Sequence, residues 1–203
     1  MQARARLALL FVFLERNVTM LTHKGTQELT TRRLILRRFA EGEAEIMYRN
    51  WASDPEVTKF LTWPAHASIE VSEKILADWL RNYERDDYYQ WAIVYEGEPI
   101  GSIAVVSRND EIEKAEIGYC MGRKWWHRGI MSEALAAVID YLFTEVGMQR
   151  IESRHDPRNP HSGGVMRKCG MTFEGILRRS DRNNQGICDA SHYAILREEY
   201  KKG

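Results

Sequence analysis

Hydrophobic positions in the first 84 residues predict one strand followed by helices. A short apolar run, Leu34 to Leu36, lies between arginines and favours a strand. After it the apolar side chains recur at helical spacing. The pattern is clearest from Ser68 to Glu84, where they form one broad face of an amphipathic helix. The predicted elements are a strand at 31–38 and helices at 41–51, 54–61 and 68–84.

The period of the pattern then becomes that of β-strands. Three apolar runs separated by short polar turns indicate antiparallel strands in succession. A helix that ends at Gly147 separates them from a further strand, and this strand–helix–strand order is typical of parallel pairing. The remaining predicted elements are strands at 88–95, 99–107, 113–121, 150–155, 171–177 and 187–196 and helices at 129–146 and 159–170.

This order of elements predicts an α+β fold with a mixed α/β arrangement. We expect a central, mostly antiparallel sheet of about seven strands, with about four helices distributed over its two faces. The chain has 203 residues, which suits a single domain with a hydrophobic core of its own. We expect that domain to span residues 25–203, and residues 1–24 to be an N-terminal extension.

The extension carries an apolar run at Leu7–Leu14 after two arginines. The run is too short to span a bilayer, and no small-residue cleavage site follows it. We therefore expect natural translation to begin at Met20, so that residues 1–19 lie upstream of the natural start. An additional helix that packs on the domain and a targeting segment are the alternatives.

The charge balance and the cysteine content indicate which partners and which compartment to expect. Lys plus Arg and Asp plus Glu number 29 each, so the formal net charge is zero. This balance argues against nucleic acid or an anionic membrane as the main partner. The three cysteines, Cys120, Cys169 and Cys188, form no paired pattern, which favours a reducing compartment and a cytoplasmic protein. Cys188 and His192 share a strand face but lack a second pair of ligands, so we expect no metal.

The loop Gly122–Arg128 leads from a predicted strand into a predicted helix. A helix start presents free backbone N–H groups and a positive dipole end, and phosphates bind there readily. Gly129 would let the backbone approach a ligand closely, and Arg123, Lys124 and Arg128 add positive charge. The P-loop and dinucleotide-binding motifs are absent. The pattern predicts a phosphate site, and an ordinary loop with solvated basic residues is the alternative.

Three segments carry a family resemblance. AEIGYCMGRKWWHRGIMSEAL, Ala115–Leu135, resembles the strand–loop–helix core of the GNAT N-acetyltransferases. The resemblance is greatest to the branch with the ribosomal-protein N-terminal (alanine and serine) acetyltransferases. NPHSGGVMRKCGMTFEG, Asn159–Gly175, and GICDASHYAILREEY, Gly186–Tyr200, are similar to the same branch, as is TTRRLILRRF near the start. Together the matches cover the chain from about Gln27 to Tyr200.

The resemblance implies acetyl-CoA as the acyl donor. It implies a sheet splayed between its fourth and fifth strands, 113–121 and 150–155, with pantetheine in the gap. A backbone N–H near Cys120 or Met121 would then face the thioester carbonyl.

Two departures from the branch are His127, where Gly is frequent, and Met131, which replaces a small residue and would crowd the phosphate turn. The implied donor-binding residues are Cys120, Met121, Gly122, Arg123, Trp126, His127, Arg128, Gly129, Ile130, Met131, Ser132, Asn159 and Ser162.

The resemblance also points to the residues that move protons. The attacking amine must be neutral, and an α-amino group has a pKa of about 7.7–8.0 against about 10.4 for lysine. A carboxylate base, acting directly or through a water, is the usual aid. Glu116 and Asp181 are the candidate bases, and a salt-bridged structural carboxylate and an exposed turn residue are the respective alternatives. Ser162 is the candidate donor to the leaving thiolate, because Met166 occupies the position of the tyrosine that many GNAT enzymes use.

The predicted function is acetyl transfer from acetyl-CoA to a primary amine by direct attack in a ternary complex. The acceptor would be a protein N-terminal amine or a small amine. One alternative is a non-catalytic acyl-CoA-binding sensor or scaffold on the same fold, and another is an RNA- or ribosome-associated protein that uses the basic loop. We expect neither a nucleic-acid nor a membrane partner, and we expect a homodimer.

Overall fold

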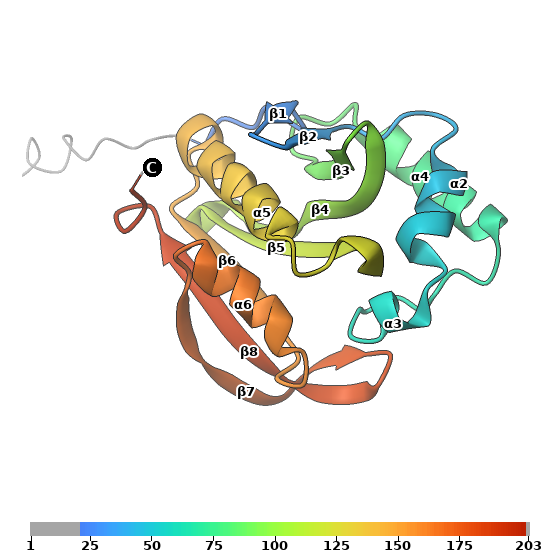
Figure 1. The fold of residues 1–203 in the computed structure, drawn as a ribbon. Helices are drawn as coiled ribbons and strands as arrows, with labels where there is room; N and C mark the ends of the chain where they lie inside the picture. Colours follow the sequence, from blue (N-terminus) through green and yellow to red (C-terminus); the bar gives the residue numbers. More distant parts are fainter. Residues whose placement is uncertain (1–20, 202–203) are drawn as a thin grey trace, which may run out of the picture.

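Eight strands form one open sheet in the computed structural model, which describes residues 21–201. Their order is β1-β2-β3-β4-β5-β6-β8-β7, and every pair of neighbours is antiparallel except β5 and β6 (Figure 1). The mostly antiparallel, mixed sheet predicted from the sequence is therefore confirmed. The strands are β1 Leu29–Thr30, β2 Leu34–Arg37, β3 Gln90–Tyr95, β4 Glu98–Asn109, β5 Lys114–Met121, β6 Arg150–His155, β7 Thr172–Asn183 and β8 Gly186–Leu196.

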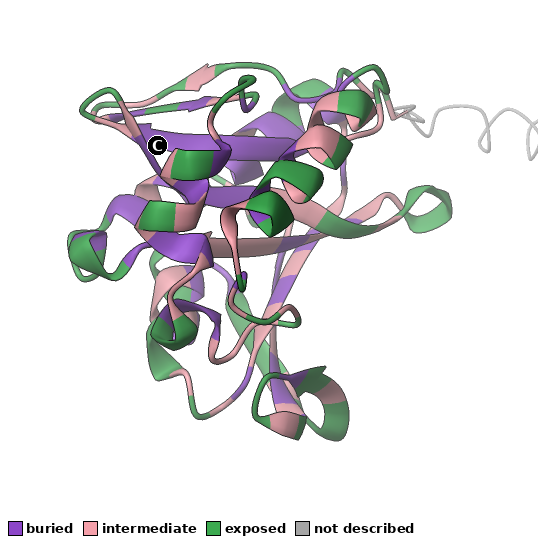
Figure 2. Cartoon of the chain, turned by 90° about the vertical axis from the view of Figure 1, so that its right-hand side faces the viewer, coloured by how far each residue is buried: buried purple, intermediate pink, exposed green. Residues whose placement is uncertain are grey.

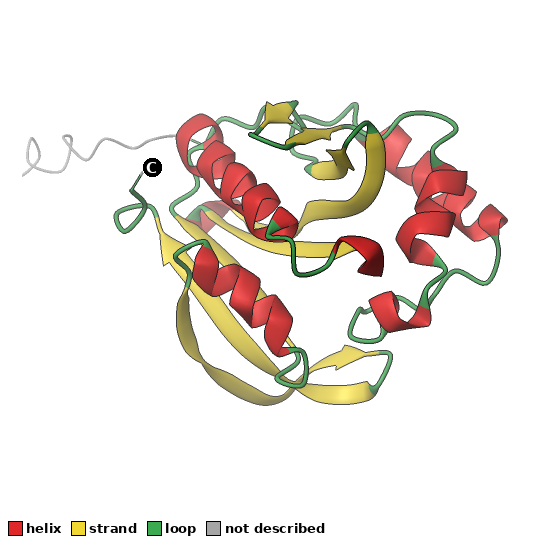
Figure 3. Ribbon diagram, in the orientation of Figure 1, coloured by secondary structure: helices red, strands yellow, loops and turns green. Residues whose placement is uncertain are grey.

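The helices lie around the sheet (Figure 3), and the chemistry of single residues explains two of their ends. The Asp54 side chain accepts a hydrogen bond from the Glu56 N–H at the start of α3. Gly147, with φ +93°, ends the helical segment that begins with α5. Both α2 and α5 continue into a π-helical turn, at Tyr48–Ala52 and Leu142–Val146. The α-helices are α2 Ala44–Met47, α3 Pro55–Thr58, α4 Ile69–Asn82, α5 Ile130–Tyr141 and α6 Pro160–Lys168.

The two faces of the sheet bury separate hydrophobic clusters. Trp91 and Ile93 of β3 belong to the cluster beneath α5 and α6, whereas Ala92 and Val94 belong to the cluster beneath α2 and α4. This alternation is what a strand covered on both faces requires. Figure 2 shows the buried residues concentrated along the strands and on the helix faces toward them. Helices therefore cover both faces of the sheet, as the sequence predicts.

The sheet is splayed between β5 and β6. The two strands pair in parallel over only three residue pairs, from Lys114 opposite Arg150 to Glu116 opposite Glu152. Immediately beyond these pairs, the hydroxyl group of Ser153 donates a hydrogen bond to the Ile117 carbonyl oxygen, 2.8 Å away. Beyond these pairs, the edge of β5 that faces β6 has no partner strand. The predicted gap between the fourth and fifth main strands is therefore present.

Two features of the sheet differ from the sequence prediction. The short strand β1 precedes the predicted first strand and pairs with it, Leu29 opposite Leu36. Strand β7 continues to Asn183, well past the predicted end at residue 177. Most of the added residues are exposed, because β7 is an edge strand. Residues 181–183 are paired in register with β8, residues 178–180 form an irregularity in that pairing, and no hydrophobic pattern of their own marks them as a strand.

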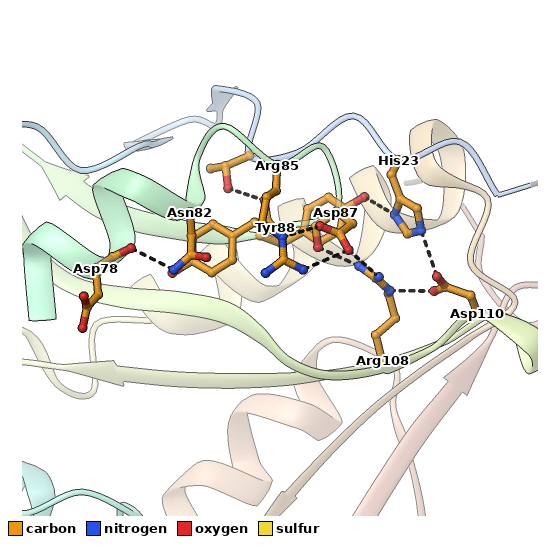
Figure 4. Close-up of polar contacts among 10 residues, drawn as sticks. His23, Asp78, Asn82, Arg85, Asp87, Tyr88, Arg108 and Asp110 are labelled. Carbon is orange, nitrogen blue, oxygen red and sulfur yellow. Dashed lines mark hydrogen bonds and ion pairs between the residues drawn. The ribbon is translucent and has the colours of Figure 1, made fainter.

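The start of the described chain is tied to the far end of the sheet by polar contacts. His23 Nδ1 lies 2.7 Å from the Tyr89 hydroxyl group. His23 Nε2 lies 3.4 Å from Asp110 Oδ2, and Asp110 in turn forms an ion pair with Arg108 at 2.6 Å (Figure 4). The Gly25 N–H donates to the backbone of the same region, at the Asp86 carbonyl. Residues 1–20, with the expected upstream segment 1–19, lie outside the described residues. A domain boundary after residue 24 stays a prediction.

Candidate active site

A cavity of about 1020 Å³ lies at the splay and is lined by residues from many parts of the chain. The unpaired part of β5 forms one wall, and the starts of α5 and α6 form another. Residues of β4 and β6, the loop after α3 and the β7–β8 hairpin also line it. The residues implied from sequence that line the cavity are Glu116, Cys120, Met121, Trp126, His127, Gly129, Ile130, Met131, Ser132, Asn159, Ser162 and Asp181.

Backbone groups of alternate β5 residues face the gap. The Ile117 carbonyl accepts its hydrogen bond from β6, and the Met121 carbonyl accepts one from the Trp126 indole Nε1 at 2.7 Å. Because every second residue of a strand directs its backbone groups to the same side, the Met121 N–H also faces the gap. Cys120 is directed the opposite way, toward its partner Ser102 on β4. Of the two amides named from sequence, only that of Met121 is directed into the gap.

The turn before α5 has the geometry of a phosphate site. Gly129 is the N-cap of α5 and has φ +71°, while His127 has φ +60°. The first N–H groups of the helix have no acceptor within the helix and point toward its open end. Met131 is 6% exposed and belongs to the core cluster, and it also lines the cavity. The expectation that it crowds the turn stays a prediction.

Three residues implied from sequence do not line the cavity. Gly122 packs against the Asn50 carbonyl and the Trp125 ring, so it fixes the exit from β5. The Arg123 guanidinium forms an ion pair with Asp54 at 2.6 Å. Arg128 is exposed, and its carbonyl accepts a hydrogen bond from Arg33. Donor-binding roles for Gly122, Arg123 and Arg128 stay predictions.

The two candidate bases lie in one ion-pair network. Arg154 of β6 donates through Nη1 to Glu116 and through Nε to Asp181 at 2.7 Å. Glu116 and Asp181 are separate alternatives in the prediction from sequence, which does not include Arg154. Asp181 lies in β7 opposite Cys188, so the alternative in which it belongs to a turn is wrong.

The environments of the two carboxyl groups shift their pKa values in opposite directions. Burial raises the pKa of Glu116, and the nearby Arg154 charge offsets only part of that effect. Burial also acts on Asp181, but the hydrogen bonds from Arg154 and from the Arg182 N–H outweigh it and lower the pKa of Asp181. Glu116 is therefore the more basic of the two carboxylates, and Asp181 is the more readily ionised.

Ser162 lies in the first turn of α6 and is held by a tyrosine that the sequence analysis did not identify. The Tyr119 hydroxyl group lies 3.0 Å from the Ser162 carbonyl oxygen and 3.1 Å from its Oγ. Burial raises the pKa of Tyr119 well above its usual value. Asn159 stands at the N-cap of α6, but its side chain makes no capping hydrogen bond, and it lines the cavity. Glu116 and Tyr119 are three positions apart on β5, so their side chains lie on opposite faces of the sheet.

Comparison with known proteins identifies the family. The family described as "Acetyltransferase (GNAT) domain" matches residues 33–172. The chain belongs to the GNAT acetyltransferase family. It is therefore an acetyl-CoA-dependent N-acetyltransferase, and acetyl-CoA is its acyl donor.

Relatives of this acetyltransferase cover most of its length. It is 29% identical over 176 residues to an uncharacterized N-acetyltransferase, p20, of Bacillus licheniformis, covering 86% of this chain and 98% of p20. It is 29% identical over 138 residues to the ribosomal-protein-serine acetyltransferase of Escherichia coli, covering 67% and 76%.

Solved structures share the fold of this acetyltransferase. A GNAT-family acetyltransferase from Bacillus anthracis superimposes with a TM-score of 0.75 at 26% identity, covering 85% of this chain and 99% of that one. RimL, a ribosomal L7/L12 α-N-protein acetyltransferase in complex with coenzyme A, gives 0.76 at 21% identity, covering 84% and 98%. At that identity RimL shows a common fold alone.

Within residues 21–201, no group of three or more His, Cys, Asp or Glu side chains is placed to hold a metal ion. Over the same residues, no helix has the length and apolar character needed to cross a membrane.

Proposed function

We propose that this acetyltransferase transfers the acetyl group of acetyl-CoA directly to a primary amine within a ternary complex. The observation that carries the proposal is the cavity at the splay. It brings the unpaired edge of β5 and the N-terminus of α5 together with the Glu116–Arg154–Asp181 network. Donor-binding groups and a carboxylate base therefore open onto one space, with no covalent intermediate required.

The backbone supplies most of the donor site in this proposal. The first N–H groups of α5, at Ile130, Met131 and Ser132, bind the pyrophosphate of acetyl-CoA with the help of the helix dipole. The pantetheine arm lies along the unpaired edge of β5. The Met121 N–H then faces the thioester carbonyl and stabilises the negative charge that develops on its oxygen during attack.

Glu116 is the general base in the proposed mechanism. Its raised pKa makes it a better proton acceptor than Asp181, and it lines the cavity on the face of β5 opposite Tyr119. It takes the proton that the amine loses as the new N–C bond forms, directly or through a water. Arg154 orients the carboxylate and keeps Asp181 ionised. We expect Glu116→Gln to lower kcat/KM by about a hundredfold and Asp181→Asn to act less strongly.

Ser162 and Tyr119 stabilise the leaving thiolate in the same mechanism. A thiol has a pKa of about 8.5, and a tyrosine has a pKa of about 10 before burial raises it. Complete proton transfer from either hydroxyl group to the thiolate is therefore unfavourable. Hydrogen-bond donation from Ser162, whose Oγ is held by Tyr119, lowers the energy of the thiolate until it gains a proton from solvent.

A protein N-terminal amine is the proposed acceptor. The E. coli relative is named for acetylation of a ribosomal-protein serine, and an α-amino group loses its proton more readily than a lysine does.

Free thiols at all three cysteines, Cys120, Cys169 and Cys188, support a cytoplasmic location.

Release of free coenzyme A thiol across a panel of acceptors tests this function. The panel contains peptides with Ser, Ala or Met at the N-terminus, the same peptides blocked at the N-terminus but with a free lysine, and small amines. We expect turnover with free N-termini that Glu116→Gln reduces. Acetyl-CoA binding without turnover on any acceptor would contradict the proposal and favour a non-catalytic acyl-CoA sensor.

A further inference from the structure

The turn between β5 and α5 holds two residues in the left-handed region, with Arg128 between them. Gly129 adopts φ +71° without strain because it has no Cβ atom. His127 adopts φ +60°, a region that is uncommon for a residue with a Cβ atom, so contacts from its surroundings help to hold it there. The conformation of the proposed pyrophosphate site therefore depends on contacts from elsewhere in the fold.

The first two residues of the turn have such contacts. The indole Nε1 of Trp126 donates to the Met121 carbonyl at 2.7 Å, which fixes the start of the turn on β5. The His127 ring packs edge-on against His161 of α6, with 4.7 Å between the ring centroids. Neither contact reaches the peptide that joins Arg128 to Gly129, which leads directly into α5.

Arg33, from the turn between β1 and β2, reaches this peptide. Its Nη1 donates to the Arg128 carbonyl at 3.0 Å, and its Nε donates to Glu133 Oε2 at 2.7 Å. The Arg33 backbone N–H and the Thr31 hydroxyl group donate to Glu133 Oε1 at 2.9 and 2.7 Å. One guanidinium group therefore connects the left-handed turn to a carboxylate near the start of α5, through planar geometry that lysine lacks.

The ion pair within this connection is partly shielded from solvent, whereas the hydrogen bond to the Arg128 carbonyl is exposed. The Arg33 and Glu133 side chains are 29% and 19% exposed, so salt screens their attraction less than it screens that of a surface pair. Burial alone would raise the pKa of Glu133, but the donors on Thr31 and Arg33 outweigh it and lower that pKa. Glu133 stays ionised at neutral pH, and the link persists.

We propose that Arg33 is a positioning residue for the pyrophosphate of the donor. It holds the Arg128–Gly129 peptide so that the free N–H groups of α5 converge on the pyrophosphate. The inference rests on the proposed donor site. Because Arg33 acts by supporting a strained turn, its importance depends on the residue at position 127. A glycine there would adopt the same φ without support, and Arg33 would matter less.

Calorimetric titration with coenzyme A, which needs no acceptor, tests this dependence. The variants are Arg33→Gln, His127→Gly and the double variant. The control is Arg32→Gln, which removes the same charge from the exposed neighbouring residue. We expect Arg33→Gln to raise the Kd for coenzyme A about tenfold or more, and Arg32→Gln to leave it within about twofold. In the His127→Gly background we expect Arg33→Gln to raise the Kd less than about threefold.

The outcomes separate this inference from the donor site itself. Failure of the wild-type chain to bind coenzyme A would contradict the donor site. Normal wild-type binding with equal effects of Arg33→Gln and Arg32→Gln would overturn the role of Arg33. So would an Arg33→Gln effect of the same size in both backgrounds. Circular dichroism checks folding. If Arg33→Gln fails to fold, Arg33→Lys takes its place in the same comparison of single and double variants, because lysine keeps the charge but lacks the planar guanidinium group.

Discussion

At the scale of single residues, Arg154 determines how the two acidic groups of the site behave. It binds Glu116 and Asp181 together, so neither carboxylate acts as an isolated charge. Asp181 has the lowered pKa expected of a carboxylate beside a guanidinium group, whereas burial keeps the pKa of Glu116 raised. This difference is the physical reason for assigning the base to Glu116.

Replacement of Arg154 by methionine tests this assignment through pH dependence. Glu116 must be ionised to act as a base, so kcat/KM rises with pH as Glu116 loses its proton. The Arg154 charge lowers the pKa of Glu116, so Arg154→Met raises that pKa further and moves the acid limb of the kcat/KM profile to higher pH. Arg158→Met is the control, because Arg158 pairs with Asp156 and not with Glu116. An acid limb at the same pH in both variants would contradict the role of Glu116.

At the scale of elements, helix α6 places Ser162 through close contact with the sheet. Its two central glycines differ sharply in their surroundings. A Cβ atom at Gly163 would lie 2.5 Å from His155 Nε2 and 3.2 Å from the Tyr193 hydroxyl group. At Gly164 the nearest atom would be the end of the Arg167 side chain, 3.9 Å away. Of these two glycines, only Gly163 packs closely against β6 and β8.

Alanine at each glycine gives a matched pair of variants in one helix. We expect Gly163→Ala to lower the free energy of unfolding by about 1–3 kcal/mol, because His155 and Tyr193 must shift. We expect Gly164→Ala to raise it by about 0.5–1 kcal/mol, because alanine has the higher helix propensity and meets open space. Urea unfolding followed by circular dichroism measures both. Equal effects of the two substitutions would show that α6 does not pack closely at Gly163.

Several elements could be predicted from the sequence because their signal is local. The amphipathic period of α4, the turn-separated strands β3 to β5 and the glycine that ends the α5 segment depend on neighbouring residues. The Arg154 pairs and the Tyr119–Ser162 contact could not be predicted in this way. They join residues 27 to 43 positions apart, and register across the splay decides them. Strand β7 was predicted too short because an exposed edge strand carries no hydrophobic alternation.

At the scale of the whole molecule, the fold consists of two parts of a sheet that are joined at one end. Strands β1–β5 with α5 form one part, and strands β6–β8 with α6 form the other (Figure 1). Ion pairs of Glu152 with Lys114 and Arg150, at 2.7 and 3.1 Å, reinforce the joined end. At the open end the unpaired edge of β5 lies in the cavity. A homodimer stays a prediction.

Hydrogen–deuterium exchange with and without saturating coenzyme A is the most direct test of the central claim that the donor binds in the splay. Binding should order the unpaired edge of β5 and the first turn of α5 and satisfy their N–H groups. We predict slower exchange in peptides covering residues 117–132 and no change in β2 and β3. Unchanged exchange in residues 117–132, with coenzyme A bound, would contradict the account.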